Sequence, residues 1–252
     1  MKRITFFAYG VICYAIFFAT FLYAIGFIGN VFVPKSMDSG PVGPMLPALL
    51  INAALLGIFA VQHSVMARPA FKKWWTRFVP EPVERSTYVL LSSVALIVMF
   101  AFWQPLGGTI WNVESPAGVI VLRTLYAFGW LLVLVATFLI NHFDLFGLRQ
   151  VWYYLRGKEY KPLGFQKPWL YKYVRHPLYV GWLFAFWATP TMTIAHLVFA
   201  LATTGYILIA IQLEERDLEE ALGEDYAKYR REVPMLVPGV SKQPQTQEAL
   251  GS

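Results

Sequence analysis

Five long stretches of the sequence carry no Asp, Glu, Lys or Arg, and they limit the possible folds more than any other feature. These stretches are residues 4–34, 41–67, 87–113, 124–142 and 177–213. About 20 such residues are enough for a helix to cross the hydrocarbon core of a bilayer. The chain of 252 residues is 57% hydrophobic and 14% charged, which leaves too little polar surface for a water-soluble globule. The sequence therefore predicts an all-α integral membrane protein with about five transmembrane helices.

The basic residues gather in alternate loops, and this distribution predicts the topology. The N-terminus, residues 68–85 and residues 149–175 are rich in Lys and Arg, whereas residues 104–122 contain neither. Cytoplasmic loops carry such an excess, so we expect both termini and the basic loops in the cytoplasm. The net charge of +6 reports this topology and does not predict nucleic-acid binding. Because Cys13 is the single cysteine, the chain has no intrachain disulfide and no cysteine metal cluster. We expect no metal.

The last apolar stretch is too long for one transmembrane helix. Its 37 residues would extend about 55 Å as a helix, against a hydrocarbon core of about 30 Å. We expect a break at residues 189–193, so that a short arm, 177–188, and a full span, 194–213, form a helical hairpin. Amphipathic cytoplasmic helices are expected within 68–85 and after the last span.

The sequence predicts three regions along the chain. Residues 1–140 are expected to form the N-terminal transmembrane helices, and residues 141–238 a catalytic region made of a cytoplasmic connector, the hairpin and a C-terminal helix. The polar residues 239–252 are predicted to be a disordered tail.

Two segments of the catalytic region carry groups suited to binding. Pro177 presets the first turn of the hairpin and keeps His176 out of the helix, and the free N–H groups of that turn favour an anion. The alternative is a basic interfacial anchor. Glu214 and Glu215 lie where the last span ends, and a carboxylate at a membrane boundary needs a partner, either a ligand or a nearby arginine.

These segments resemble the C-terminal pattern of the isoprenylcysteine carboxyl methyltransferase and NnrU-like superfamily. The matching residues are Arg175-His176-Pro177-Leu178-Tyr179-Val180-Gly181, Glu214-Glu215, Gly223-Glu224-Asp225-Tyr226-Ala227-Lys228-Tyr229 and Val233-Pro234. The resemblance implies S-adenosylmethionine bound at the cytoplasmic side and released as S-adenosylhomocysteine. The cofactor-binding residues that it implies, with aromatic groups able to stack on the sulfonium, are Tyr171, Tyr173, Arg175, His176, Pro177, Tyr179, Gly181, Glu214 and Glu215.

Two further segments, residues 141–150 and 62–68, look like the corresponding parts of the methanethiol S-methyltransferases, which accept a small thiol. The prenylcysteine enzymes carry an arginine in the last span, and residues 195–213 have none. The resemblance therefore implies a small volatile thiol as acceptor and dimethyl sulfide as product. We expect the protein in a bacterial inner membrane.

A thiol is methylated as the thiolate, so the site needs a base or a cation. His142 with Asp144 or Arg149 is the predicted catalytic group, although His142 also fits an interfacial histidine bonded to a carbonyl. His63 is expected to form a structural hydrogen bond between helices.

Other functions remain open at this point. The acceptor is alternatively a prenylcysteine, a lipid amine or another hydrophobic thiol. Sterol reductases resemble this superfamily near the C-terminus, so an NADPH-dependent reductase is a second class, and a non-enzymatic membrane protein is a third. Membrane lipid is a partner in every case.

Overall fold

The computed structural model describes residues 1–164 and 166–239. Five of its helices are long and apolar enough to cross a membrane. They are α1 (Lys2–Gly29), α2 (Met45–Ala67), α4 (Glu81–Phe102), α5 (Pro116–Ile140) and α9 (Ile194–Leu222). The predicted all-α membrane fold with about five transmembrane helices is confirmed. Helix α4 begins six residues before the uncharged stretch 87–113, because Pro82 and the acidic Glu81 and Glu84 suit a helix N-terminus.

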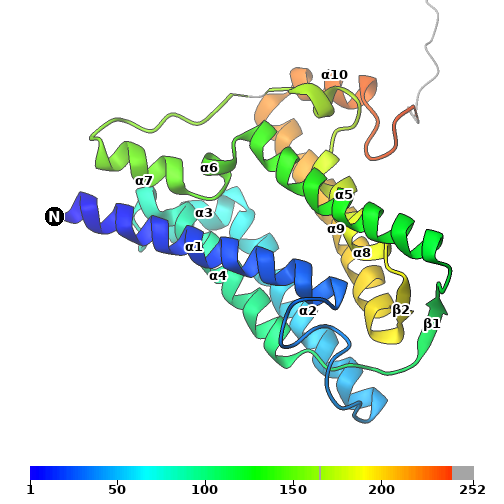
Figure 1. The fold of residues 1–252 in the computed structure, drawn as a ribbon. Coiled ribbons are helices and arrows are strands. Elements are labelled where there is room, and N and C mark those ends of the chain that lie inside the picture. Colours follow the sequence, from blue (N-terminus) through cyan, green and yellow to red (C-terminus); the bar gives the residue numbers. More distant parts are fainter. Residues whose placement is uncertain (165, 240–252) are drawn as a thin grey trace, which may run out of the picture.

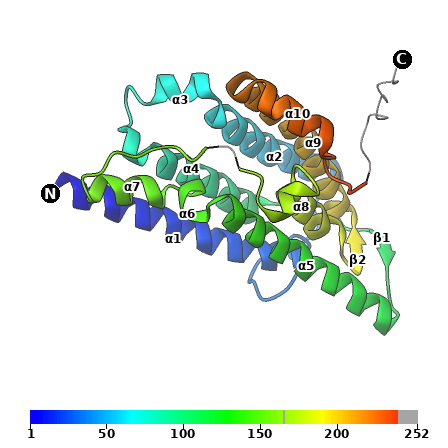
Figure 2. The same ribbon diagram turned by 90° about the horizontal axis from the view of Figure 1, so that it is seen from above.

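The helices pack in two groups (Figures 1 and 2). Helix α4 lies between α1 and α2, while α5 packs along the short helix α8 (Pro177–Trp187), which leads into α9. Buried aromatic side chains join the groups: Trp103, directly after α4, meets Phe27 of α1 and Phe199 of α9 with ring centroids 6.4 and 5.8 Å away. The core therefore holds the N-terminal helices against the hairpin.

The predicted hairpin is present, and it differs from the prediction in the strand at its break and in the length of its second helix. Helix α8 has 11 residues, so it extends only about 16 Å and does not cross a bilayer. A short strand, β2 (Thr191–Thr193), occupies the expected break and pairs antiparallel with β1 (Thr109–Asn112). No strand was predicted, because three or four residues are too few to show an alternating pattern. Beyond the predicted end of the span, α9 continues without interruption to Leu222.

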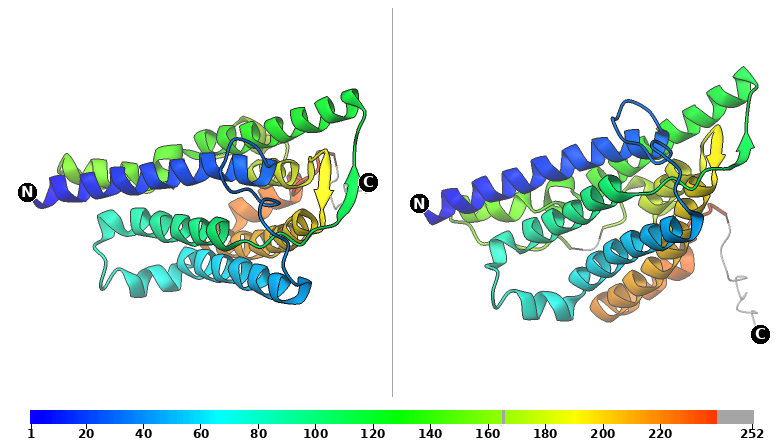
Figure 3. Two further views of the ribbon diagram at one scale, coloured as in Figure 1. Left: turned by 60° about the horizontal axis from the view of Figure 1, so that its bottom comes forward. Right: turned by 90° about the horizontal axis from the view of Figure 1, so that it is seen from below.

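Shorter helices lie at those ends of the long helices that are away from the strands β1 and β2, and this side of the bundle is called the basic end below (Figures 1 and 3). These elements are α3 (Pro69–Trp75), α6 (His142–Leu145), α7 (Leu148–Leu155), the 3₁₀ helix η1 (Trp169–Lys172) and α10 (Glu224–Glu232). The strands β1 and β2 lie at the opposite end. Helix α3 confirms the helix expected within residues 68–85. The predicted disordered tail falls on residues 240–252, apart from Gly239, and these lie outside the described residues.

Candidate functional site

The start of α8 is shaped by the proline that the sequence places there. Pro177 is the first residue of the helix, and His176 before it has a non-helical backbone with φ −126° and ψ 62°. The chain that follows α10 covers this point, because the backbone N–H groups of Arg175 and His176 donate to the carbonyls of Pro234 and Met235. Two segments far apart in the sequence therefore meet at the basic end.

Glu215 is the centre of a buried ionic cluster. It is 2% exposed, and its Oε1 accepts from Arg175 Nε at 2.7 Å and lies 2.9 Å from His176 Nε2. Its Oε2 lies 3.2 Å from Arg230 Nε on α10. A carboxylate this deeply buried is stable only when it is paired in this way. The cluster fixes α9, α10 and the start of α8 to one another.

Glu214 has a different environment from its neighbour. Its Oε2 accepts a hydrogen bond from the Tyr179 hydroxyl at 3.0 Å, and no other described side chain bonds this carboxylate. The Tyr171 hydroxyl is buried without a hydrogen-bond partner in the described chain. Burial first, and then the negative charge of Glu214, raise the pKa of Tyr171. These three side chains leave hydrogen-bonding capacity that a ligand can use.

The remaining predicted cofactor residues do not share this arrangement. The ring of Tyr173 is largely exposed. Gly181 lies against α5, where an added Cβ would stand 2.8 Å from the carbonyl oxygen of Gly129. The structure thus joins Tyr179 to Glu214, and gives Gly181 a packing position.

The three predicted catalytic residues occupy two separate environments. His142 is buried, with Nε2 2.8 Å from the Tyr14 hydroxyl and Nδ1 2.9 Å from the Thr137 hydroxyl. Desolvation lowers its pKa below the ordinary 6.5. Asp144 instead accepts from Arg149 at 3.0 Å, and hydrogen bonds to the Tyr160 hydroxyl complete this second group.

A polar cluster on the N-terminal helices was only partly predicted. The expected interhelical bond of His63 is confirmed, since the Tyr88 hydroxyl of α4 lies 3.0 Å from its ring nitrogens. Sequence analysis missed Tyr88 itself and Tyr206 of α9, which bonds Ser64 at 3.0 Å. Their one signal was a phenol inside an otherwise apolar span, where a partner is expected.

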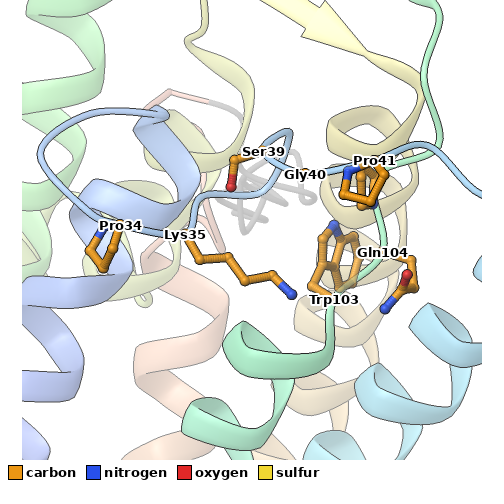
Figure 4. Close-up of a pocket in the computed structure, with 8 residues that line it drawn as sticks. Pro34, Lys35, Ser39, Gly40, Pro41, Trp103 and Gln104 are labelled. Atoms are coloured by element: carbon orange, nitrogen blue, oxygen red, sulfur yellow. The ribbon is translucent and has the colours of Figure 1, made fainter.

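A pocket of about 480 Å³ opens at the opposite end of the bundle (Figure 4). Lys35 and Trp103 are among the residues that line it, and none of the predicted site residues does. The ammonium of Lys35 already donates to the carbonyl of Ala101 at 2.6 Å. This pocket is therefore separate from the candidate site.

Comparison with known proteins decides the family. The chain is 62% identical over 234 residues to the methanethiol S-methyltransferase of Crocosphaera subtropica, covering 93% of this chain and 92% of that protein. The chain belongs to the methanethiol S-methyltransferase family. The Mycobacterium tuberculosis member is 55% identical, with 94% and 98% coverage.

More distant similarity extends beyond the methanethiol S-methyltransferases. Nurim of Rattus norvegicus is 31% identical over 183 residues, which are 69% of each chain. No protein-family profile matches the chain, and no solved structure does.

Proposed function

We propose that this protein is a membrane S-methyltransferase that converts methanethiol to dimethyl sulfide with S-adenosylmethionine as methyl donor. The observation that carries the proposal is the sequence identity of 62% and 55% to two proteins named methanethiol S-methyltransferase. Both alignments cover more than 90% of each chain. Length coverage of this extent means that the membrane helices and the hairpin both have counterparts in those relatives.

The residues around Glu214 fit the donor. A carboxylate suits the ribose hydroxyls or the ammonium of S-adenosylmethionine, and Glu214 has one oxygen beyond its bond to Tyr179. The buried Tyr171 hydroxyl has no hydrogen-bond partner in the described chain, and a polar ligand would provide one. Phenol rings attract a sulfonium, and the first turn of α8 at Pro177 suits a carboxylate. When bound, S-adenosylmethionine supplies the electrophilic methyl group.

The ionic cluster supports this site indirectly. Arg175 and His176 both bond Glu215, so in this proposal the three residues orient Glu214 and the start of α8. Holding these groups in place contributes to catalysis because methyl transfer depends on alignment of the reacting atoms. Direct contacts of Arg175 and His176 with the cofactor stay predictions, and so does the role of Tyr173.

The acceptor is small, apolar and soluble in lipid, so it can reach a site inside the bundle from the membrane. We place the basic end in the cytoplasm of a bacterial cell, because α3, α7 and the N-terminus carry the basic residues there. A site at that end draws the polar donor from the cytoplasm and the thiol from the bilayer.

The test is headspace gas analysis of the purified protein in detergent, supplied with methanethiol and S-adenosylmethionine. We expect dimethyl sulfide above the level of a mock preparation, and tight binding of S-adenosylhomocysteine by calorimetry. The matched control is Glu214→Gln, which should reduce both signals. Binding of NADPH without S-adenosylhomocysteine would reject the proposal in favour of a reductase.

A further inference from the structure

A polar cluster lies between α2, α4 and α9 near the basic end. We name it the His63 cluster, and its members are His63, Ser64, Tyr88, Ser92 and Tyr206. Tyr88 and Ser92 of α4 lie 3.0 and 3.3 Å from the imidazole, and Ser64 bonds Tyr206 at 3.0 Å. The cluster therefore joins the N-terminal helices to the last transmembrane helix.

This cluster shares helix α9 with the proposed donor site. Tyr206 of α9 bonds Ser64 in the cluster, and Glu214 of α9 accepts from Tyr179 in the donor site. On α9, Tyr206 precedes Glu214 by eight residues, or about 12 Å along the axis. Helix α9 therefore connects the His63 cluster to the carboxylate proposed to bind the donor.

His63 and His142 differ in their capacity to bind an acceptor. Both nitrogens of His142 have their own hydroxyl partner, and its ring stacks on Phe138 with centroids 4.3 Å apart. At His63, Nδ1 has two hydroxyls within reach, Ser92 at 3.3 Å and Tyr88 at 3.0 Å, whereas Nε2 has only Tyr88, which bonds one nitrogen at a time. When Tyr88 bonds Nδ1, Nε2 is left for a ligand.

One more observation favours a thiolate at His63. The guanidinium of Arg85 lies over the Tyr88 ring, 5.6 Å from its centroid. Its positive charge would stabilise a thiolate that forms beside the imidazole.

We propose that His63 binds the thiol acceptor and takes its proton, with Tyr88 holding the imidazole in place. This inference rests on the proposed function. The thiol proton passes to a nitrogen of His63, and the sulfur lone pair forms the bond to the transferred methyl carbon. The electron pair of the breaking carbon–sulfur bond stays on the donor sulfur, which becomes a neutral thioether. The positive charge of the sulfonium is thereby replaced by that of the imidazolium.

The test compares acceptors of different acidity. His63→Asn keeps a polar group but removes the base, so turnover of methanethiol should fall by about 100-fold, the low end of general-base effects. 2,2,2-Trifluoroethanethiol is of similar size and ionises more readily, so its turnover should fall by less than about tenfold. Tyr88→Phe, which keeps the ring, should cause a smaller loss with methanethiol.

Measurements without turnover separate this role from a structural one. Calorimetry should show S-adenosylhomocysteine affinity unchanged in His63→Asn, and weaker binding of methanethiol to that complex. The matched control is His196→Asn, at a buried histidine of the opposite end that bonds the carbonyl of Phe186. Its loss of turnover, if any, should be equal for the two thiols.

The outcomes distinguish the two proposals. Full turnover of methanethiol by His63→Asn, or equal losses with both thiols, would overturn the role of His63 while leaving the proposed function intact. A wild-type protein that binds S-adenosylhomocysteine but methylates neither thiol would overturn the proposed function, and this inference with it.

Discussion

Tyr179 on α8 donates its phenolic hydrogen to Glu214 on α9 at 3.0 Å, which ties the short arm of the hairpin to the end of the last apolar span. The next residue, Glu215, is 2% exposed and has arginine and histidine partners. Two consecutive carboxylates therefore have different environments. One retains capacity for a ligand, and the other is fully engaged with the protein.

Glu214→Gln should weaken binding of S-adenosylhomocysteine by about tenfold to a hundredfold, because a hydrogen bond to a charged group contributes about 1.5–3 kcal/mol. The free energy of unfolding should change by less than about 1 kcal/mol, since one bond to Tyr179 is weakened. Calorimetry and thermal unfolding in detergent measure the two effects. Unchanged affinity would remove Glu214 from the binding site.

Glu215→Ala should mainly lower the stability of the protein, whereas Glu214→Gln should mainly lower its affinity for S-adenosylhomocysteine. It leaves Arg175 and His176 without their shared carboxylate in a buried position, and breaking a buried pair costs about 3–5 kcal/mol. Thermal unfolding should therefore move to clearly lower temperature. If instead the unfolding temperature stays at the wild-type value while ligand affinity falls, then Glu215 contacts the ligand directly.

Tyr171→Phe removes a buried hydroxyl that has no partner in the described chain. Stability should stay the same or rise, because an unsatisfied polar group is lost. Affinity for S-adenosylhomocysteine should fall about threefold to tenfold if the ligand pairs with this hydroxyl. Tyr154→Phe, at a ring that stacks on Phe6, is the control and should change neither quantity.

The sequence predicted the spans and the two segments of the candidate site, because uncharged runs and the order of the Pro177 and Glu214 segments are visible along the chain. It did not assign different environments to Glu214 and Glu215. That distinction depends on Arg175 and His176 before α8 and on Arg230 of α10, which the fold brings to Glu215. Helical spacing alone also gave no reason to connect Tyr88 with His63, since they belong to different helices.

The buried state of His142 predicts a pH dependence. Burial lowers its pKa below 6.5, so the unfolded chain binds a proton at a pH where the folded protein does not. This histidine's contribution to stability is therefore complete above pH 6.5 and is lost as the pH falls below it. Unfolding temperatures measured from about pH 8 to 5 should fall more for wild type than for His142→Asn.

The predicted role of His142 as thiol base is examined with the same His142→Asn variant. A base should show a turnover loss that is relieved by 2,2,2-trifluoroethanethiol, as expected for His63→Asn. Because both nitrogens of His142 are already bonded, we expect equal losses with both thiols. Relief by the acidic thiol in this variant alone would return the role of base to His142.

Gly181→Ala should disturb the site through packing. The added Cβ would lie 2.8 Å from the Gly129 carbonyl oxygen and 2.8 Å from the Val133 nitrogen, both backbone atoms of α5 that cannot rotate away. Overpacking of this kind costs about 1–3 kcal/mol. Since α8 carries Tyr179, its displacement should also weaken S-adenosylhomocysteine binding. Gly205→Ala is the matched control, because its Cβ would meet nothing within 4 Å. Equal behaviour of the two variants in thermal unfolding and calorimetry would contradict a tight contact between α5 and α8.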